Sequence, residues 1–141
     1  MYGRYSGNIS IIEEDAGWRN FAANTLRARG YTVDVRAHYD ETSSHSETGN
    51  SLLTILGFST IGPRELRIID HVTKHHTPMR VIVVSSSLSS KSMREAFLRG
   101  VLDVAQKSFD EVELSDLVRQ QTGSETSRTK YVARMRSNEN E

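Results

Sequence analysis

The chain has 141 residues, its 18 basic and 18 acidic side chains cancel at pH 7, and it contains no cysteine. This length fits one domain with a real hydrophobic core, and the balanced charge excludes a strong overall field for nucleic acid or an anionic membrane. Without cysteine, disulfides and thiolate metal sites are excluded. No apolar run approaches the roughly 20 residues that cross a bilayer, and no signal-peptide pattern is present, so we expect a cytoplasmic protein with no membrane partner.

The first predicted strand is Asn8–Ile12, after a short polar lead-in at residues 1–7. Glu13, Glu14 and Asp15 follow at its carboxyl end. Adjacent carboxylates are costly there unless a cation or solvent lies among them. A plain helix start is the alternative, because acidic residues favour the first turn of a helix electrostatically. Taken alone, the triplet favours the helix start.

A helix and a second strand are predicted next. The helix covers Gly17–Arg29 and ends at Gly30, with Trp18 on its inner stripe as a core residue rather than a ligand platform. Residues 31–37 alternate in polarity and predict a strand. One face of that strand carries Tyr31, Val33 and Val35.

The segment Asp40–Ser51 contains no large apolar residue. A helix on the surface of a sheet needs an apolar stripe to bury, and this segment has none. We therefore expect a mobile loop, or a short turn of helix that packs poorly.

The third predicted strand, Leu52–Leu56, ends at Gly57, and no carboxylate occurs between Glu47 and Glu65. A helix follows from Pro63, with apolar residues at helical spacing. His71 and His75 lie one helical turn apart on it, which is plausible metal-site geometry. Because no third ligand is near in sequence, we favour a solvated helix end and predict no metal site.

A strand, a helix and a further strand follow within Met79–Phe109. The strand Val81–Val84 is continuously apolar, as in a parallel strand buried on both faces, and serines follow it. The helix Lys91–Arg99 ends at Gly100, and the strand Val101–Ala105 precedes Lys107. A last helix covers Asp110–Gln120, and residues 121–141 form a polar, locally basic tail or linker.

The stretch Met79–Phe109 resembles the fourth strand, fourth helix and fifth strand of a response-regulator receiver domain. That family keeps a Ser or Thr after strand four and a lysine after strand five. Ser85 and Lys107 match them and lie 22 residues apart. The resemblance covers residues 8–120 and implies an α/β, flavodoxin-like three-layer sandwich. Its parallel sheet of five strands would have the order 2-1-3-4-5, with the second helix degenerate or missing.

The functional positions of the family are altered in this chain. Glu13 and Glu14 replace the Asp pair that binds Mg²⁺, and Leu56 or Gly57 stands where strand three would carry the phosphorylated Asp. An acyl phosphate needs a carboxylate, and a hydroxyl cannot form the same anhydride. Val104 replaces the aromatic switch residue of strand five. Lys107 is expected to meet Glu13 or Glu14 and to replace the metal as the neutralising charge.

The resemblance therefore implies a degenerate receiver, or pseudo-receiver, that is not an enzyme, needs no cofactor or metal and does not depend on phosphorylation. In receivers, the face made by helix four, strand five and helix five usually meets protein partners. Here that face would present Arg94, Arg99 and Glu111. A homodimer is one possible assembly.

Two alternatives remain. One is a receiver phosphorylated at an unusual residue, such as Ser59, Ser85 or a glutamate. The other is a DNA-binding regulator that uses the basic tail, but no helix-turn-helix follows Gln120 and the net charge is zero, so no nucleic-acid partner is expected.

Overall fold

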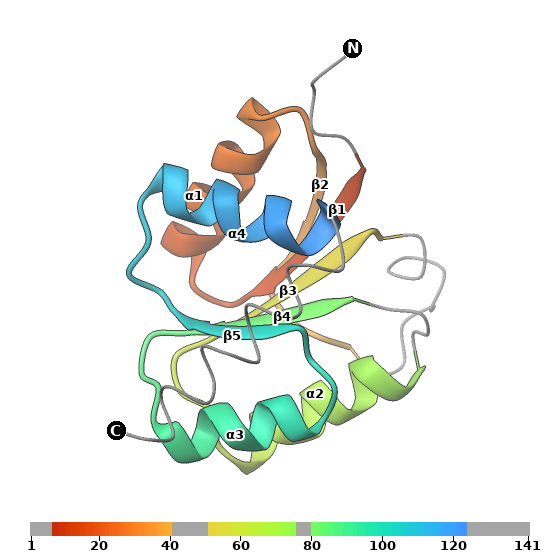
Figure 1. Ribbon diagram of the computed structural model, residues 1–141, viewed down its shortest axis with the longest axis vertical. Helices are drawn as coiled ribbons and strands as arrows, with labels where there is room; N and C mark the ends of the chain where they lie inside the picture. The colour runs from red at the N-terminus through yellow and green to blue at the C-terminus, as the bar shows by residue number, and fades with distance from the viewer. Residues whose placement is uncertain (1–6, 41–50, 76–79, 124–141) are drawn as a thin grey trace.

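A parallel sheet of five strands forms the centre of the molecule (Figure 1). The computed structural model describes residues 7–40, 51–75 and 80–123. The strands are β1 Asn8–Glu13, β2 Thr32–Arg36, β3 Leu53–Phe58, β4 Val81–Ser85 and β5 Asp103–Gln106. Their order is β2-β1-β3-β4-β5, so the predicted sheet is confirmed.

Helices cover both faces of this sheet. They are α1 Ala16–Ala28, α2 Pro63–His75, α3 Ser90–Leu98 and α4 Glu111–Gly123. Figure 1 shows α1 and α4 on one face and α2 and α3 on the other, which is the predicted three-layer arrangement. The helix after β2 that the family would have is not among these four, but residues 41–50 of the predicted polar loop lie outside the described residues.

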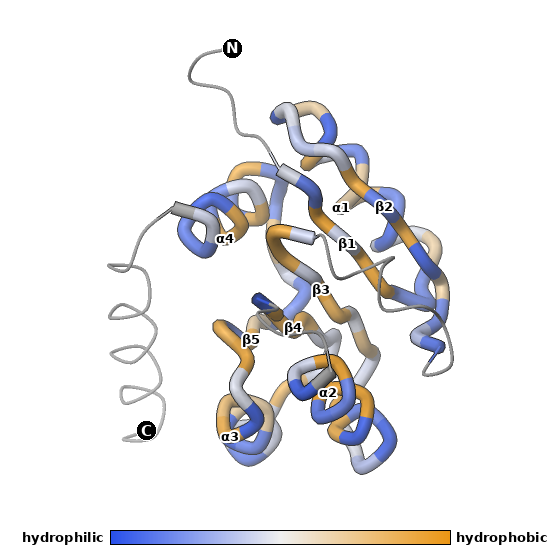
Figure 2. The backbone as a smooth tube through the Cα atoms, turned by 90° about the vertical axis from the view of Figure 1, so that its right-hand side faces the viewer, coloured by the Kyte–Doolittle hydropathy of each residue, from blue (hydrophilic) through white to orange (hydrophobic). Residues whose placement is uncertain are grey.

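Each face of the sheet carries its own apolar core, because neighbouring parallel strands point paired residues to the same side. Ile9 is in register with Val33 and Leu53, and all three pack toward α1 and α4. Ile12 is in register with Leu56 and packs toward α2 and α3. The continuous apolar runs thus reflect strands buried on both faces, and Figure 2 shows the inner strands as mainly hydrophobic.

Edge strand β2 is apolar on one side only. Val33 is buried, whereas Val35, which the alternation places on the same face, is 37% exposed. The predicted face of β2 is therefore buried at Val33 and partly exposed at Val35, near the end of this edge strand. On the opposite side Asp34 and Arg36 form an ion pair at 3.9 Å.

The ends of the helices follow local sequence signals. Asp15 caps α1 by accepting a hydrogen bond from the Gly17 amide, and Ser89 caps α3. Gly30 and Gly100 follow these helices with φ of 105° and 96°, a conformation that favours glycine. Both predicted glycine stops are therefore correct.

Helix α4 runs further than predicted. Gln121, expected to open a polar tail, is 2% exposed and its carbonyl accepts a hydrogen bond from Arg80. The helix continues to Gly123 because this glutamine packs inward, a role its polarity hides. The rest of the predicted tail, 124–141, and most of the lead-in, 1–6, lie outside the described residues. None of the helices in the described ranges is long and apolar enough to cross a membrane.

Candidate functional site

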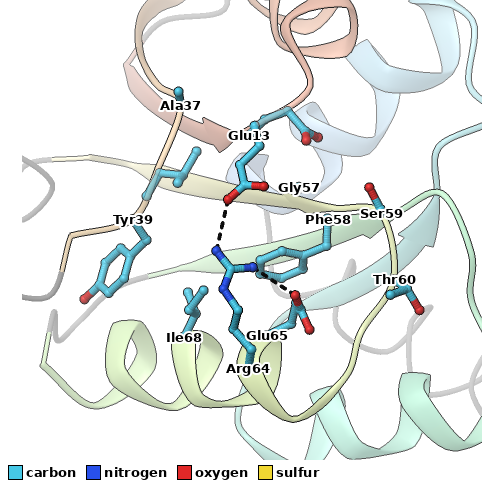
Figure 3. A pocket seen from close by; sticks show the side chains of 12 residues that line it. Glu13, Ala37, Tyr39, Gly57, Phe58, Ser59, Thr60, Arg64, Glu65 and Ile68 are labelled. Carbon is cyan, nitrogen blue, oxygen red and sulfur yellow. Dashed lines mark hydrogen bonds and ion pairs between the residues drawn. The ribbon is translucent and has the colours of Figure 1, made fainter.

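The candidate site lies at the carboxyl ends of β1 and β3. Strand β1 has β2 on one side and β3 on the other, so the strand order reverses at β1. Open α/β sheets bind ligands outside the strand ends at such a point. A pocket of about 220 Å³ opens there (Figure 3). It is lined by Ile12, Glu13, Glu14, Ala37, Tyr39, Gly57, Phe58, Ser59, Thr60, Arg64, Glu65 and Ile68.

Glu13 and Lys107 form a buried ion pair at this edge. Lys107 Nζ lies 2.6 Å from Glu13 Oε1, and the two side chains are 5% and 2% exposed. The other carboxylate oxygen, Oε2, accepts a hydrogen bond from the Asp15 amide at 3.1 Å. Lysine and carboxylate neutralise each other in a place that excludes water, so the predicted meeting of Lys107 with a glutamate falls on Glu13.

Trp18 covers the lysine. Lys107 Nζ lies 5.5 Å from the centroid of the Trp18 ring, within the range of a cation–π contact. Trp18 is also half-buried and packs against the core on the α1 and α4 face, as predicted. The indole therefore belongs to the core and at the same time shields the ion pair from solvent.

Gly57 is required by the position of Glu13. The two residues are in register across β1 and β3. A Cβ at residue 57 would lie 2.0 Å from Glu13 Oε1 and 2.7 Å from its Cδ, closer than real Cβ atoms come. The carboxylate of Glu13 thus occupies the space into which any side chain at residue 57 would project.

Glu14 points away from this pair. Its carboxylate is 54% exposed and lies 3.0 Å from Arg64 and 3.3 Å from His38. The hydrogen bond from Arg64, followed by that from His38, lowers the pKa of Glu14. Successive strand residues project to opposite sides, so the two glutamates predicted to replace the Asp pair do not converge on one point. In the described ranges no cluster of three or more His, Cys, Asp or Glu forms a metal-binding group.

Arg64 and Glu65 form the opposite wall of the pocket, at the start of α2 (Figure 3). Burial acts to raise the pKa of Glu65, but hydrogen bonds from the Gly62 amide, its own backbone and Arg64 outweigh it and lower the pKa. Arg64 lies 3.0 Å from Glu65 and 3.0 Å from Glu14, so it joins the helix to the end of β1. Sequence reasoning missed Arg64. Its place in the first turn of a helix that follows a strand end was the available signal.

Tyr39 lines the pocket on the side next to β2 and contacts His71 of α2. The Tyr39 hydroxyl and His71 Nδ1 form a hydrogen bond, and the rings meet edge to face with centroids 5.5 Å apart. His71, predicted at a solvated helix end, is half-buried in this contact. That prediction was wrong because the connection after β2 folds back onto α2. The side chain of His75 is outside the described atoms.

Ser85 lies inside the structure rather than in the pocket. It is fully buried, and its hydroxyl is within hydrogen-bond distance of the carbonyls of Ser59, at 3.2 Å, and Ser87, at 2.7 Å. The hydroxyl thus ties together the loops that follow β3 and β4. Ser59, by contrast, is exposed and lines the pocket.

The remaining predicted residues lie outside the pocket. Val104, at the switch position, is 2% exposed within the core of the α2 and α3 face. Arg94 and Glu111 are exposed on α3 and α4. Arg99, just after α3, pairs with Asp70 of α2 and with Glu95.

Arg99 therefore holds α2 and α3 together. It lies 3.3 Å from Asp70 and 2.9 Å from Glu95, and its side chain is 26% exposed. The hydrogen bond to Glu95 is the main cause that raises the pKa of Arg99. Because Arg99 already pairs with two carboxylates of its own chain, it is a weaker candidate for an ion pair with a partner protein.

Comparisons with known proteins assign the fold. No protein-family model matches the chain, and no curated protein matches it. A putative pilus assembly-related protein from Burkholderia pseudomallei is 19% identical with a TM-score of 0.72, over 82% of this chain and 88% of that one. A response regulator from Thermotoga maritima is 16% identical with a TM-score of 0.72, over 85% and 100% of the two chains.

NtrX from Brucella abortus is 22% identical with a TM-score of 0.71, over 89% of this chain. The present chain spans only 29% of the NtrX chain. Response regulators are among these structural neighbours, and the present chain, with its strand order β2-β1-β3-β4-β5, shares their fold. The protein therefore has the flavodoxin-like receiver fold, and at these identities the likeness establishes the fold alone.

Proposed function

We propose that the chain is a degenerate receiver that acts in signal transduction through contacts with other proteins, without phosphotransfer and without enzymatic activity. One observation carries the proposal. The Glu13 carboxylate lies over Gly57 and is paired with Lys107 at 2.6 Å. In the resemblance to receivers, Gly57 is one of the two residues that match the acceptor position, and a side chain from β1 fills the space beside it.

Glu13 is a poor acceptor for a phosphoryl group in this arrangement. An attacking carboxylate needs an oxygen that the donor can approach, and Glu13 is 2% exposed. Its pairing with Lys107 also uses the cation that would stabilise a phosphoryl group. Glu14 and Glu65, the other carboxylates of the pocket, are both held by Arg64.

The alternative is phosphorylation at a non-standard residue, and the geometry distinguishes between the candidate acceptors Ser85 and Ser59. Ser85 is fully buried with its hydroxyl engaged by two carbonyls, which argues against it as an acceptor. Ser59 is exposed at the pocket and remains the residue that this alternative would use.

Incubation with acetyl phosphate and Mg²⁺, followed by intact-mass spectrometry, tests the proposal. We expect no gain of a phosphoryl group under conditions that label an ordinary receiver run in parallel. A gain that persists in Ser59→Ala and is lost in Glu13→Gln would contradict the proposal. A gain lost only in Ser59→Ala would support the alternative.

The contact surface is the second half of the proposal. We place it on the face made by α3, β5 and α4, where Arg94 and Glu111 are exposed. Arg94→Glu should reduce the recovery of protein partners in a pull-down from the native source. Lys74→Glu, a charge reversal at an exposed residue of α2, serves as the control. Equal losses in both variants would argue against this face.

A further inference from the structure

A groove lies beside the outermost strand β5 and along α4. Its volume is about 260 Å³, and it is lined by Ala105, Phe109, Glu113, Asp116, Leu117 and Gln120. The four lining residues of α4 recur at helical spacing, so they form one stripe that faces the groove. Phe109 and Leu117 supply apolar walls, while Glu113 and Asp116 supply negative charge.

The surface around this groove is acidic. The segment 110–119 reads DEVELSDLVR, with four acidic residues and one arginine. Part of this is explained by the start of α4, since Asp110 and Glu113 cap each other's backbone amides at 2.8 and 2.9 Å. Asp116 is further along the helix, its side chain is 48% exposed, and it pairs with Arg119 at 3.1 Å. With four acids and one arginine, the segment keeps a net negative charge beyond the helix start and this pair.

Apolar surface is also present at this place. Val112, one helical turn before the groove residue Asp116, is 58% exposed. Strand β5 is the last strand of the sheet, and β4 is its strand partner within the described part of the chain. A segment that docks here would thus need cations together with a few apolar side chains.

The chain itself carries such a segment four residues beyond the end of α4. Residues 128–136 read RTKYVARMR, with four cations, no acidic residue and three apolar side chains larger than alanine. We propose that this segment occupies the groove between β5 and α4 of the same molecule. Its cations would face Glu113 and Asp116, and an apolar side chain such as Tyr131 would contact Phe109 and Leu117.

The length of the intervening chain permits this return. Helix α4 has 13 residues and is therefore about 20 Å long. An extended chain covers about 3.3 Å per residue, so roughly six residues are enough to run back along the helix. Residues 124–129 supply that length and bring Lys130–Arg136 beside the groove.

Docking at this groove would place the segment on the face that we propose for protein partners. In this respect the inference rests on the proposed function, because the segment and a partner would then compete. Docking itself is measured on the isolated protein and does not depend on that function. A failure of the docking experiment and a failure of the phosphorylation test are therefore separate results.

The test uses a nitroxide label on the full chain. Because the chain contains no cysteine, Ala133→Cys gives a single attachment site. In a ¹⁵N-labelled sample we expect the label to broaden amide signals of residues 105–120 and to leave those of α2 unchanged. No broadening at the groove would overturn the proposal.

Two charge reversals on α4 provide the matched comparison. In Asp116→Lys we expect the ratio of docked to free segment to fall roughly fivefold, the size of a partly exposed charge interaction. In Glu111→Lys, an exposed acid of the same helix that does not line the groove, the broadening should stay near its wild-type level. Equal losses in both variants would overturn the groove as the docking place.

A mixed sample separates the two possible sources of the segment. Spin-labelled chains without ¹⁵N are combined with ¹⁵N chains that carry no label. Docking within one molecule predicts no broadening at 105–120 in this mixture. Broadening there equal to that of the doubly labelled sample would assign the groove to a second copy and overturn the proposal.

Discussion

The crevice at the ends of β1 and β3 and the groove between β5 and α4 use their charges in opposite ways. In the crevice, Glu13 and Lys107 are buried and neutralise each other at 2.6 Å. In the groove, Asp116 is 48% exposed and pairs with Arg119 at 3.1 Å, in a segment that has four acids and one arginine. Buried charges that are already paired stabilise one structure, whereas exposed excess charge attracts partners. The comparison assigns stability to the crevice and recognition to the groove.

Lys107→Ala is the substitution with the largest expected effect. It would leave the Glu13 carboxylate buried without its cation, which costs about 3–5 kcal/mol of folding free energy. Urea unfolding measures this loss, with Lys91→Ala on the exposed surface of α3 as the control. A stably folded Lys107→Ala protein with lost partner binding would reverse the comparison, because the crevice would then be the working site.

Gly57→Ala tests whether the crevice is filled as tightly as the distances indicate. The new Cβ would lie 2.0 Å from Glu13 Oε1, so we expect a loss of about 1–3 kcal/mol from overpacking. Gly17→Ala is the control, because its Cβ would lie 3.4 Å from Asp15 Oδ1, an ordinary contact distance.

The double variant Gly57→Ala with Glu13→Asp sharpens this test. A shorter carboxylate makes room for the methyl group, so the two effects should be non-additive in urea unfolding. Strict additivity would mean that Glu13 does not fill the space over Gly57.

The fold was predictable because its signals are local. Continuous apolar runs such as Val81–Val84 predict strands buried on both faces, and Gly30 and Gly100 end helices for reasons of backbone conformation. The strand order came from the resemblance to receivers rather than from these signals. Local patterns did not indicate the burial of Gln121, because that burial depends on what lies beside the end of α4.

The site was predictable only in part, because its geometry depends on register between distant segments. Sequence position identified Glu13 and Lys107, but it did not separate the inward Glu13 from the outward Glu14. That difference follows from the alternation of side chains at the end of β1. The contact of Glu13 with Gly57 requires the pairing of β1 with β3, which no single segment contains.

Arg99→Glu and Arg94→Glu together test whether Arg99 stabilises the fold, whereas Arg94 is available on the partner face. Arg99→Glu would place a negative charge beside Asp70 and Glu95, so we expect a loss of about 1–2 kcal/mol. Arg94→Glu, on the exposed side of α3, should change stability by about 0.5 kcal/mol or less. Thermal unfolding of both variants checks this, and equal losses would remove the structural role given to Arg99.

The smallest effect on stability is expected at Glu14, which lines the crevice but is about as exposed as the groove residue Asp116. Its pKa is lowered from 4.5, mainly by the hydrogen bond from Arg64. A lowered carboxyl pKa adds stability that is present above the unfolded pKa and is lost as the pH falls through the folded pKa. The loss therefore falls below pH 4.5, and it should be slight because water screens the pair.

Arg64→Gln tests this by moving the Glu14 pKa back toward its ordinary value, as followed by carboxyl NMR titration. Added salt should produce a shift in the same direction, because it screens an exposed ion pair. Glu111, which is exposed on α4, provides the reference carboxyl in the same spectra. An unchanged Glu14 pKa in Arg64→Gln would mean that the exposed wall of the crevice is not organised by Arg64. The contrast with the groove would then rest on Glu13 and Lys107 alone.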